Sequence, residues 1–313
     1  MGRHAVLCEH LPVIDIGRVG LWISLLDQYP TSRVREVVVE LESLGWPCIW
    51  RPEASGRDAI VSAAHMLDAT TTLRVATGVA QIQARHPMTA KAAQLTLHEG
   101  SGGRFLLGLG VSHAPMITAA RKLAYETPYS DMAAYLAAMK EAPFNAYTGE
   151  DDDAPSTVLA ALGPKMLRLA ADAADGAHPY FAPVDHTAAA REIIGPDKLL
   201  APEQMVVIDD DPTRARELAV EHMSRYLRLP NYTNNLLRFG FDETDVAGPS
   251  PRLVDAIVVC GDVDAVRRRV AEHHDAGADH VCVQVLTARD APLPMREWSE
   301  LADAFDLSNS KPV

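Results

Sequence analysis

The sequence has no long uninterrupted run of apolar residues. Although 48% of its 313 residues are hydrophobic, no window reaches the roughly 18 apolar residues that a membrane-spanning helix needs. The first residues, MGRHAVLCEH, contain no apolar stretch of the length found in secretory signals. We therefore expect a cytoplasmic protein with no membrane partner.

Cysteine is scarce and dispersed. The four cysteines, Cys8, Cys48, Cys260 and Cys282, form no C-x-x-C pair, and no H-x-H or H-E-x-x-H motif is present. The sequence therefore predicts neither a metal site nor a redox dithiol, and the cysteines are expected to stay reduced. A G-x-S-x-G elbow is also missing, which argues against a serine hydrolase.

Positive charge is in short supply as well. The chain has 29 Lys and Arg against 42 Asp and Glu, a formal net charge of −13. This excess repels nucleic acids, and no basic stripe with interleaved aromatic residues offsets it. A small-molecule substrate is the expected partner.

What the sequence does contain is a regular alternation of short β-branched runs and alanine-rich helical segments. About eight such units favour a single α/β domain, residues 1–313, folded as a TIM (β/α)8 barrel. The segment from about residue 230 to 261 is polar and turn-rich, and we interpret it as a helical insertion before the last helix and strand. The expected strands are residues 17–23, 47–50, 73–80, 104–111, 157–162, 175–182, 204–212 and 278–286.

The functional side chains of such a barrel lie at the carboxyl ends of its strands. Among them, His113 and Glu53 are the candidate acid–base groups, because imidazole titrates near neutrality and a carboxylate can exchange protons. The expected substrate pocket contains Trp22, Trp50, Arg51, His178 and Tyr180.

The stretch RFLLGLGVSHAP, residues 104–115, ends an apolar strand with two glycines and a histidine. A dinucleotide-binding G-x-G-x-x-G turn would need a third glycine where His113 stands, so a Rossmann site is disfavoured. Gly108 and Gly110 leave space, either for a flat ligand at the strand end or for crowded neighbours inside the barrel. The sequence leaves both alternatives open.

The stretch ALGPKM, residues 161–166, offers an anion site. A strand ends, Gly163 opens the turn and Pro164 starts a helix, whose free N–H groups and dipole favour a phosphate. Lys165 could add a charge there. An ordinary strand-to-helix turn would have the same sequence, so this alternative also stays open.

Taken together, several segments resemble the bacterial-luciferase-like superfamily, and within it the actinobacterial branch that uses coenzyme F-420, a deazaflavin. They include GRVGLW (17–22), TGVAQIQARHPMTAKAAQLTL (77–97), GRFLLGLGVSHAP (103–115) and ALGPKMLRLAADAADGAHPYF (161–181). The resemblance extends over nearly the whole chain. It implies a luciferase-like barrel with an insertion and with the cofactor lying across its mouth. Members of the family often dimerise, so the resemblance allows a homodimer and leaves the oligomeric state open.

By the same resemblance, the Gly78–Val79 bond would be a non-proline cis peptide behind the central ring of the cofactor. His113 would take the place of a proton-transferring carboxylate in sugar-phosphate-oxidising relatives. Those relatives carry an Asp-His pair after the second strand, where this chain has Arg51-Pro52-Glu53, so sugar-phosphate oxidation is not expected. The residues implied at the cofactor are Gly78, Val79, Ala80, Gly110, Val111, Ala161, Leu162, Gly163, Pro164 and Lys165.

Three functions are compatible with these residues. The first is hydride transfer between coenzyme F-420 and a small organic substrate, with the protein supplying orientation and proton handling. The second is a monooxygenation that uses flavin mononucleotide (FMN) in the same barrel. The third, suggested by the missing Asp-His pair, is a barrel that binds the cofactor without catalysis.

Overall fold

The computed structural model describes residues 14–148 and 154–309. Cys8 and most of the acidic segment 149–156 therefore lie outside the described residues. Cys48, Cys260 and Cys282 are free thiols, and the first and last of these are buried.

A parallel sheet of eleven strands forms the centre of the molecule, with strand order β10-β9-β11-β1-β2-β3-β5-β6-β7-β8 and with β4 paired to β5. Strand β8 was not predicted from the sequence. The strands are β1 (Val19–Trp22), β2 (Cys48–Arg51), β3 (Arg74–Thr77), β4 (Ala80–Gln81), β5 (Phe105–Gly110), β6 (Thr157–Leu159), β7 (Gly176–Ala177), β8 (Leu199–Leu200), β9 (Glu203–Ile208), β10 (Val258–Gly261) and β11 (Val281–Val285).

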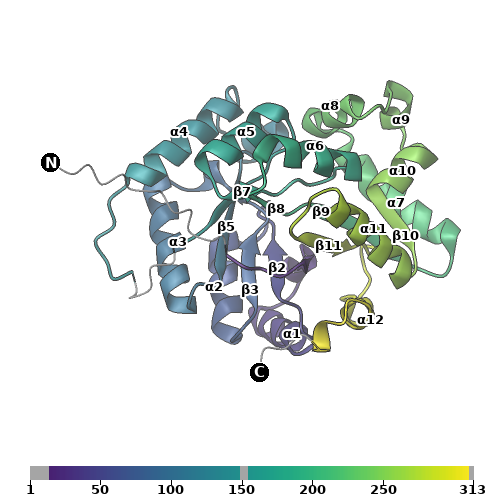
Figure 1. Ribbon diagram of the computed structural model, residues 1–313, viewed down its shortest axis with the longest axis horizontal. Coiled ribbons are helices and arrows are strands. Elements are labelled where there is room, and N and C mark those ends of the chain that lie inside the picture. Colours follow the sequence, from purple (N-terminus) through teal and green to yellow (C-terminus); the bar gives the residue numbers. More distant parts are fainter. Residues whose placement is uncertain (1–13, 149–153, 310–313) are drawn as a thin grey trace.

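Helices follow most of the strands and surround the sheet (Figure 1). The helices are α1 (Thr31–Ser43), α2 (Ala59–Ala69), α3 (Pro87–Ser101), α4 (Pro128–Glu141), α5 (Pro164–Ala173), α6 (Val184–Ile194), α7 (Pro212–Tyr226), α8 (Pro230–Arg238), α9 (Glu243–Ala247), α10 (Pro251–Ile257), α11 (Val263–Asp275) and α12 (Met295–Ala304). The predicted α/β class with a parallel sheet is confirmed.

The sheet curls, and the segment from β8 to β9 (residues 199–208) forms backbone hydrogen bonds both with the β7 segment and with β11. Only Ala201 and Pro202 separate these two strands. The backbone N–H of Glu203 donates to the carbonyl of Pro179, beyond the end of β7, over 2.9 Å. On the other side, the N–H of Cys282 in β11 donates to the carbonyl of Pro202 over 3.0 Å. The carboxyl ends of the strands therefore face a common opening.

Several helix ends follow local sequence signals. The Asp58 side chain accepts hydrogen bonds from the first-turn N–H groups of α2, and Asp211 does the same for α7. Helix α3 ends at Gly102, which adopts a left-handed φ of 63° that a residue with a Cβ disfavours. These caps fix the starts of α2 and α7 and the end of α3.

Most predicted strands are shorter in the structure, and three of them are shorter because their ends turn toward the opening. The segment predicted as 73–80 divides into β3 and β4 at the Gly78–Val79 bond, which is a cis peptide as the resemblance implied. Strand β6 stops at Leu159 and β7 at Ala177. The residues that follow them line a cavity instead of extending the ladder.

The predicted helical insertion needs one correction. Residues 230–257 do form three helices, α8, α9 and α10, and Figure 1 shows α8 and α9 together at one corner of the molecule, beyond α6. Residues 258–261, however, are strand β10, in which Val258 pairs in parallel with Met205 of β9. The apolar run VVC, residues 258–260, belongs to the sheet because it pairs with β9 and because Val258 and Val259 are buried there.

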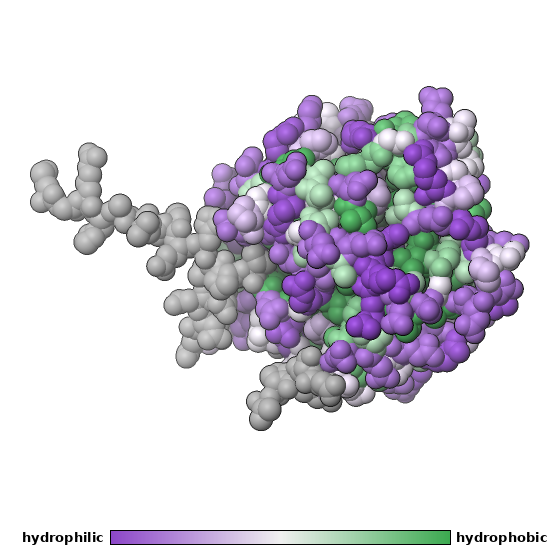
Figure 2. All heavy atoms as spheres, turned by 45° about the vertical axis from the view of Figure 1, so that its right-hand side comes forward, coloured by the Kyte–Doolittle hydropathy of each residue, from purple (hydrophilic) through white to green (hydrophobic). Residues whose placement is uncertain are grey.

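The core lies between the curled sheet and its helices. All residues of β1, β2 and β5 are buried, as expected for strands that are covered on both faces. Figure 2 shows that hydrophilic side chains cover most of the face that carries the later helices, with apolar side chains visible between them. Among the described residues, no helix is long and apolar enough to cross a membrane.

Candidate active site

A cavity of about 640 Å³ opens at the carboxyl ends of the strands. Its walls come from the segments after β1, β2, β3, β5, β6 and β7 and from α8. This volume lies in the range of ordinary ligand pockets. Most predicted site residues line it, namely Trp22, Glu53, Gly78, Val79, Gly110, Val111, His113, Ala161, Leu162, Gly163, Lys165, His178 and Tyr180.

Two predicted pocket residues, Trp50 and Arg51, do not line this cavity. Trp50 is fully buried, and its indole N–H donates to His280 Nε2 over 3.0 Å. Arg51 is 1% exposed and donates to the carbonyl of Ile23 and to the carboxylate of Asp27. The prediction was wrong for these residues because both side chains find partners inside the fold.

Ala80 and Pro164 also do not line the cavity. Ala80 is fully buried and pairs with Leu109 across the β4–β5 ladder. Pro164 is an exposed first residue of α5, and it has no N–H to offer a ligand. Ala80 and Pro164 fix the backbone of their chain neighbours, and those neighbours do line the cavity.

The structure separates the roles of the two glycines in RFLLGLGVSHAP. A Cβ on Gly108 would collide with the carbonyl oxygen of Thr77, so this glycine allows close packing of β3 against β5. Gly110 does line the cavity, and a Cβ there would collide with the Val79 side chain. Gly110 therefore leaves room for Val79 at the cavity floor, and of the two glycines only Gly110 lines the cavity.

His113 lies at the cavity edge, where its Nδ1 is 3.1 Å from Asn231 Oδ1 of α8. With the amide in this orientation, Nδ1 carries the hydrogen and Nε2 is left as an acceptor. Burial lowers the pKa of His113 below its ordinary value, and the hydrogen bond with Asn231 opposes this shift. The imidazole is therefore neutral at pH 7 and suited to take up a proton.

Both carboxylate oxygens of Glu53 already accept hydrogen bonds within the fold. One carboxylate oxygen accepts from the backbone N–H of Gln81 over 2.7 Å, and Arg85 donates to both oxygens. The Glu53 and Arg85 side chains are only 4% and 7% exposed. This buried ion pair holds the turn next to Gly78, so Glu53 positions the cavity floor and His113 is the better proton acceptor.

One end of the cavity is positively charged. Gly163 caps α5 without a side-chain hydrogen bond, so the first-turn N–H groups of Lys165 and Met166 are free to bind an anion. Lys165 and Arg238 line the same end, and Arg238 Nη1 lies 3.5 Å from where a Cβ on Gly163 would be. Within residues 14–148 and 154–309, neither cation forms a hydrogen bond or ion pair with another side chain.

An aromatic wall encloses the opposite side. The Trp22 and Tyr180 rings are 5.0 Å apart, and the Trp22 indole N–H donates to the carbonyl of Gly78 over 3.0 Å. The Tyr180 hydroxyl lies 2.9 Å from Gln284 Oε1, which can only accept, and 2.7 Å from the Tyr226 hydroxyl. Tyr180 therefore donates to Gln284 and accepts from Tyr226, which fixes the wall.

His178 forms part of the cavity floor. Its Nδ1–H donates to the carbonyl of Ala201 over 2.7 Å, and its ring stacks on Trp50 with centroids 4.3 Å apart. Burial lowers the pKa of His178 to about 4. The ring is neutral at physiological pH, and its buried Nε2 has no partner among the described residues.

Sequence reasoning missed the contribution of α8. Asn231, Asn234 and Arg238 line the cavity from this helix. Their spacing of three and four residues places them on one helical face. That periodicity in PNYTNNLLR was the available signal, but the path of the insertion could not be placed from sequence. Among the described residues, no group of three or more His, Cys, Asp or Glu could hold a metal.

A family model described as luciferase-like monooxygenase matches residues 21–280. The chain belongs to this family. The resemblance stated from the sequence motifs and the expectation of an enzyme of this class are thereby confirmed. The match covers every strand end that lines the cavity and also the α8 segment.

Similar proteins use two kinds of cofactor. Rv3520c of Mycobacterium tuberculosis, provisionally named a coenzyme F-420-dependent oxidoreductase, is 27% identical over 88% of this chain and 96% of its own length. An F-420-dependent secondary alcohol dehydrogenase, solved with an F-420–acetone adduct, has a TM-score of 0.73 at 15% identity and covers 93% of this chain and 98% of its own.

A flavin enzyme has a similar fold. The oxygenating component of 3,6-diketocamphane monooxygenase from Pseudomonas putida, solved with FMN, has a TM-score of 0.67 at 16% identity. The alignment covers 91% of this chain and 98% of that protein. At such identities the two solved structures show the fold, and the cofactor must be argued from the cavity.

Proposed function

We propose that this protein is an oxidoreductase that transfers a hydride between coenzyme F-420 and a small organic substrate. The observation that carries the proposal is the arrangement of one cavity: a free cationic end at α5, a bare floor at Gly78–Val79 and Gly110, and a neutral His113 at its edge. The name of the 27%-identical relative supports the choice of deazaflavin.

The residues present fit such a cofactor. Lys165, Arg238 and the free N–H groups of α5 would hold its phosphate, because a helix N-terminus and two cations favour an anion. Val79 and Gly110 would support the flat ring, since no side chain projects from the β5 edge at Gly110. When bound, the deazaflavin supplies hydride chemistry at its C5 carbon.

The chain's own residues handle binding and the proton. The aromatic wall of Trp22 and Tyr180 excludes water from one side of the cavity. His113 is the group that would take a proton from a substrate hydroxyl at Nε2, because Nδ1–H is held by Asn231. The same imidazolium would return the proton in the reverse direction. Glu53 acts indirectly, by holding the backbone beside Gly78.

A second candidate function is FMN-dependent monooxygenation, favoured by the FMN-bound neighbour and by a phosphate site that both cofactors could use. The third, a non-catalytic cofactor-binding barrel, is favoured only by Arg51-Pro52-Glu53 at the end of β2, where related enzymes are expected to carry an Asp-His pair.

Turnover experiments separate the three functions. Reduced F-420 is mixed anaerobically with the protein and a panel of ketones, aldehydes and enones, and recovery of the oxidised chromophore is recorded. We expect reoxidation with at least one substrate and little oxygen uptake in air. Oxygen consumption with FMN and a reductase, and none of this reoxidation, would favour the monooxygenase. Binding of F-420 with no turnover on any substrate would favour the non-catalytic barrel.

A further inference from the structure

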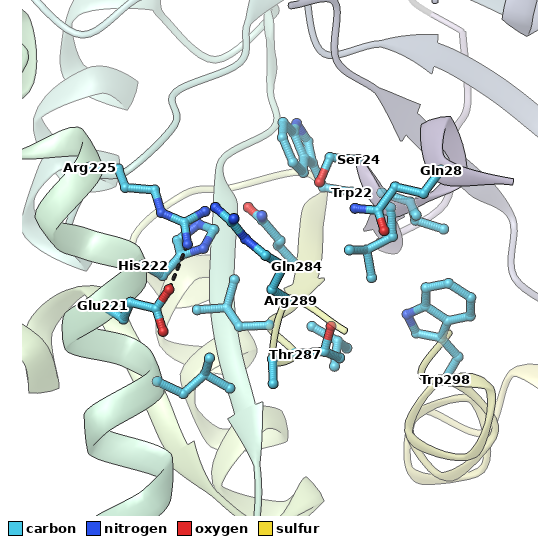
Figure 3. Close-up of a pocket in the computed structure, with 16 residues that line it drawn as sticks. Trp22, Ser24, Gln28, Glu221, His222, Arg225, Gln284, Thr287, Arg289 and Trp298 are labelled. Carbon is cyan, nitrogen blue, oxygen red and sulfur yellow. Dashed lines mark hydrogen bonds and ion pairs between the residues drawn. The ribbon is translucent and has the colours of Figure 1, made fainter. Parts of the chain in front are cut away.

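A second, smaller cavity of about 290 Å³ lies beside Trp22 (Figure 3). The segment after β1, helix α7, the segment after β11 and Trp298 of α12 form its walls. Trp22 lines both cavities, so the two are neighbours separated by this side chain. None of the roles assigned above uses the second cavity.

One half of its lining is apolar. Trp22, Ile23, Leu218, Leu286 and Trp298 surround it from four different elements. Trp22, Ile23, Leu286 and Trp298 are themselves buried. A ligand with a compact apolar body would remove this surface from water.

The other half carries an unbalanced positive charge. Arg225 and Glu221 form an ion pair of 2.8 Å one turn apart on α7, so their charges offset each other. Arg289, which extends toward His222 in Figure 3, forms no hydrogen bond or ion pair with any described residue. Burial, together with Arg225, lowers the pKa of His222 to about 4, so this ring adds no charge at pH 7.

Two further polar atoms in this wall lack partners. His222 Nε2 and Thr287 Oγ1 are buried, and neither forms a hydrogen bond with a described residue. Buried polar groups are normally satisfied, so such atoms mark a place where a ligand or water completes the site. Both belong to residues that line the cavity beside Arg289.

We propose that the second cavity is a binding site for a small monocarboxylate with an apolar body. The guanidinium of Arg289 matches a carboxylate, because a planar fork of donors pairs with two oxygens. His222 and Thr287 supply neutral hydrogen-bonding groups beside it, and Trp22, Leu218 and Trp298 contact the apolar part. A dianion such as phosphate fits less well, because one unpaired cation cannot balance it next to Glu221. This proposal goes beyond the proposed function and does not depend on the cofactor.

Titration calorimetry with hexanoate tests the site, with hexan-1-ol as the uncharged probe. We expect saturable binding of hexanoate to the wild type, no comparable binding of hexan-1-ol, and binding weaker by about tenfold or more in Arg289→Gln, which loses a charge-assisted hydrogen bond. Arg296→Gln is the matched control, because Arg296 is an exposed arginine of α12 outside both cavities. Its affinity should equal that of the wild type.

Two more variants test whether hexanoate binds in the second cavity and not in the first. Leu218→Trp fills the cavity from α7 and should abolish hexanoate binding while circular dichroism shows a folded protein. Lys165→Gln, in the first cavity, should leave binding unchanged. The proposal is overturned if the wild type does not bind hexanoate, if Arg289→Gln binds it equally well, or if Lys165→Gln weakens it as much as Arg289→Gln does.

Discussion

The carboxyl ends of β2 and β5 both carry polar side chains. Those at the end of β2 are paired inside the fold, whereas His113 after β5 lines the cavity. At the end of β2, Arg51 and Glu53 are polar residues at the position where a barrel carries its chemistry, yet both are bound to partners inside the fold. After β5, the His113 side chain forms a hydrogen bond with Asn231 of α8, and the cations at the neighbouring end of the cavity have no partner among the described residues.

The difference lies in what the rest of the chain provides. Asp27 reaches Arg51 from the turn after β1, and Arg85 reaches Glu53 from the turn after β4. Each ion pair neutralises a buried charge, which makes the β2 end a structural support. At the β5 end no described residue forms such an ion pair, so free hydrogen-bonding groups stay directed at the cavity. Changes at the two ends should therefore have different kinds of effect.

The largest expected effect is on stability, at the β2 end. Arg51→Met removes a cation that is 1% exposed and leaves Asp27 and the Ile23 carbonyl without it. We expect a loss of about 3 kcal/mol in the free energy of unfolding, measured by urea titration. Arg33→Met is the control, because its ion pair with Glu36 is solvent-exposed and should contribute less than about 1 kcal/mol. Equal losses in the two variants would contradict the structural role of Arg51.

At the β5 end the effect should be on turnover. His113→Gln removes the proposed proton acceptor while keeping a polar side chain of similar size. We expect kcat to fall by about a hundredfold or more, as for the loss of a general base, with cofactor affinity and unfolding free energy close to wild type. If kcat is unchanged at every pH, His113 does not transfer the proton.

A smaller effect is expected on cofactor affinity. Arg238→Gln removes one cation from the end of the cavity at Gly163 and should raise the Kd for F-420 by about tenfold, through the loss of a charge-assisted hydrogen bond. Arg228→Gln changes the net charge equally at an exposed position outside the cavity. A weakening of similar size in Arg228→Gln would mean that Arg238 acts only through the overall charge.

The smallest expected effect is a shift of the pH profile. The Asn231 hydrogen bond raises the pKa of His113, against the lowering by burial. In the direction of substrate oxidation, activity requires neutral His113 and falls as the pH drops through its pKa. Asn231→Leu should therefore move the acid limb of the kcat profile to lower pH, and Asn231→Asp should move it to higher pH. Shifts in the same direction for both variants would exclude this positioning role.

Local signals were sufficient for much of the fold. The apolar runs predicted the parallel α/β arrangement and most strand positions, because strands buried on both faces depend on nearby residues. The family motifs also placed His113, Gly163 and the Gly78–Val79 bond at one cavity. Placing these three features at one cavity requires only the order of the strands, because the carboxyl ends of parallel strands lie on the same side of the sheet.

The remainder depends on contacts between distant segments. Whether Arg51 faces a pocket or the interior is decided by Asp27, which is 24 residues away. The role of Arg238 is decided by where α8 lies relative to Gly163. Neither the pairing of two charges nor the path of an insertion can be read from one sequence, since many partners are equally compatible with it.

The central claim is that the cavity at the β5 end binds a deazaflavin, with its phosphate at the start of α5. The most direct measurement is a fluorescence titration of the purified protein with F-420 and, separately, with FMN. The account predicts saturable micromolar binding of F-420, tighter than that of FMN and weakened by Lys165→Gln and Arg238→Gln. No saturable binding of F-420, or a clear preference for FMN, would contradict it.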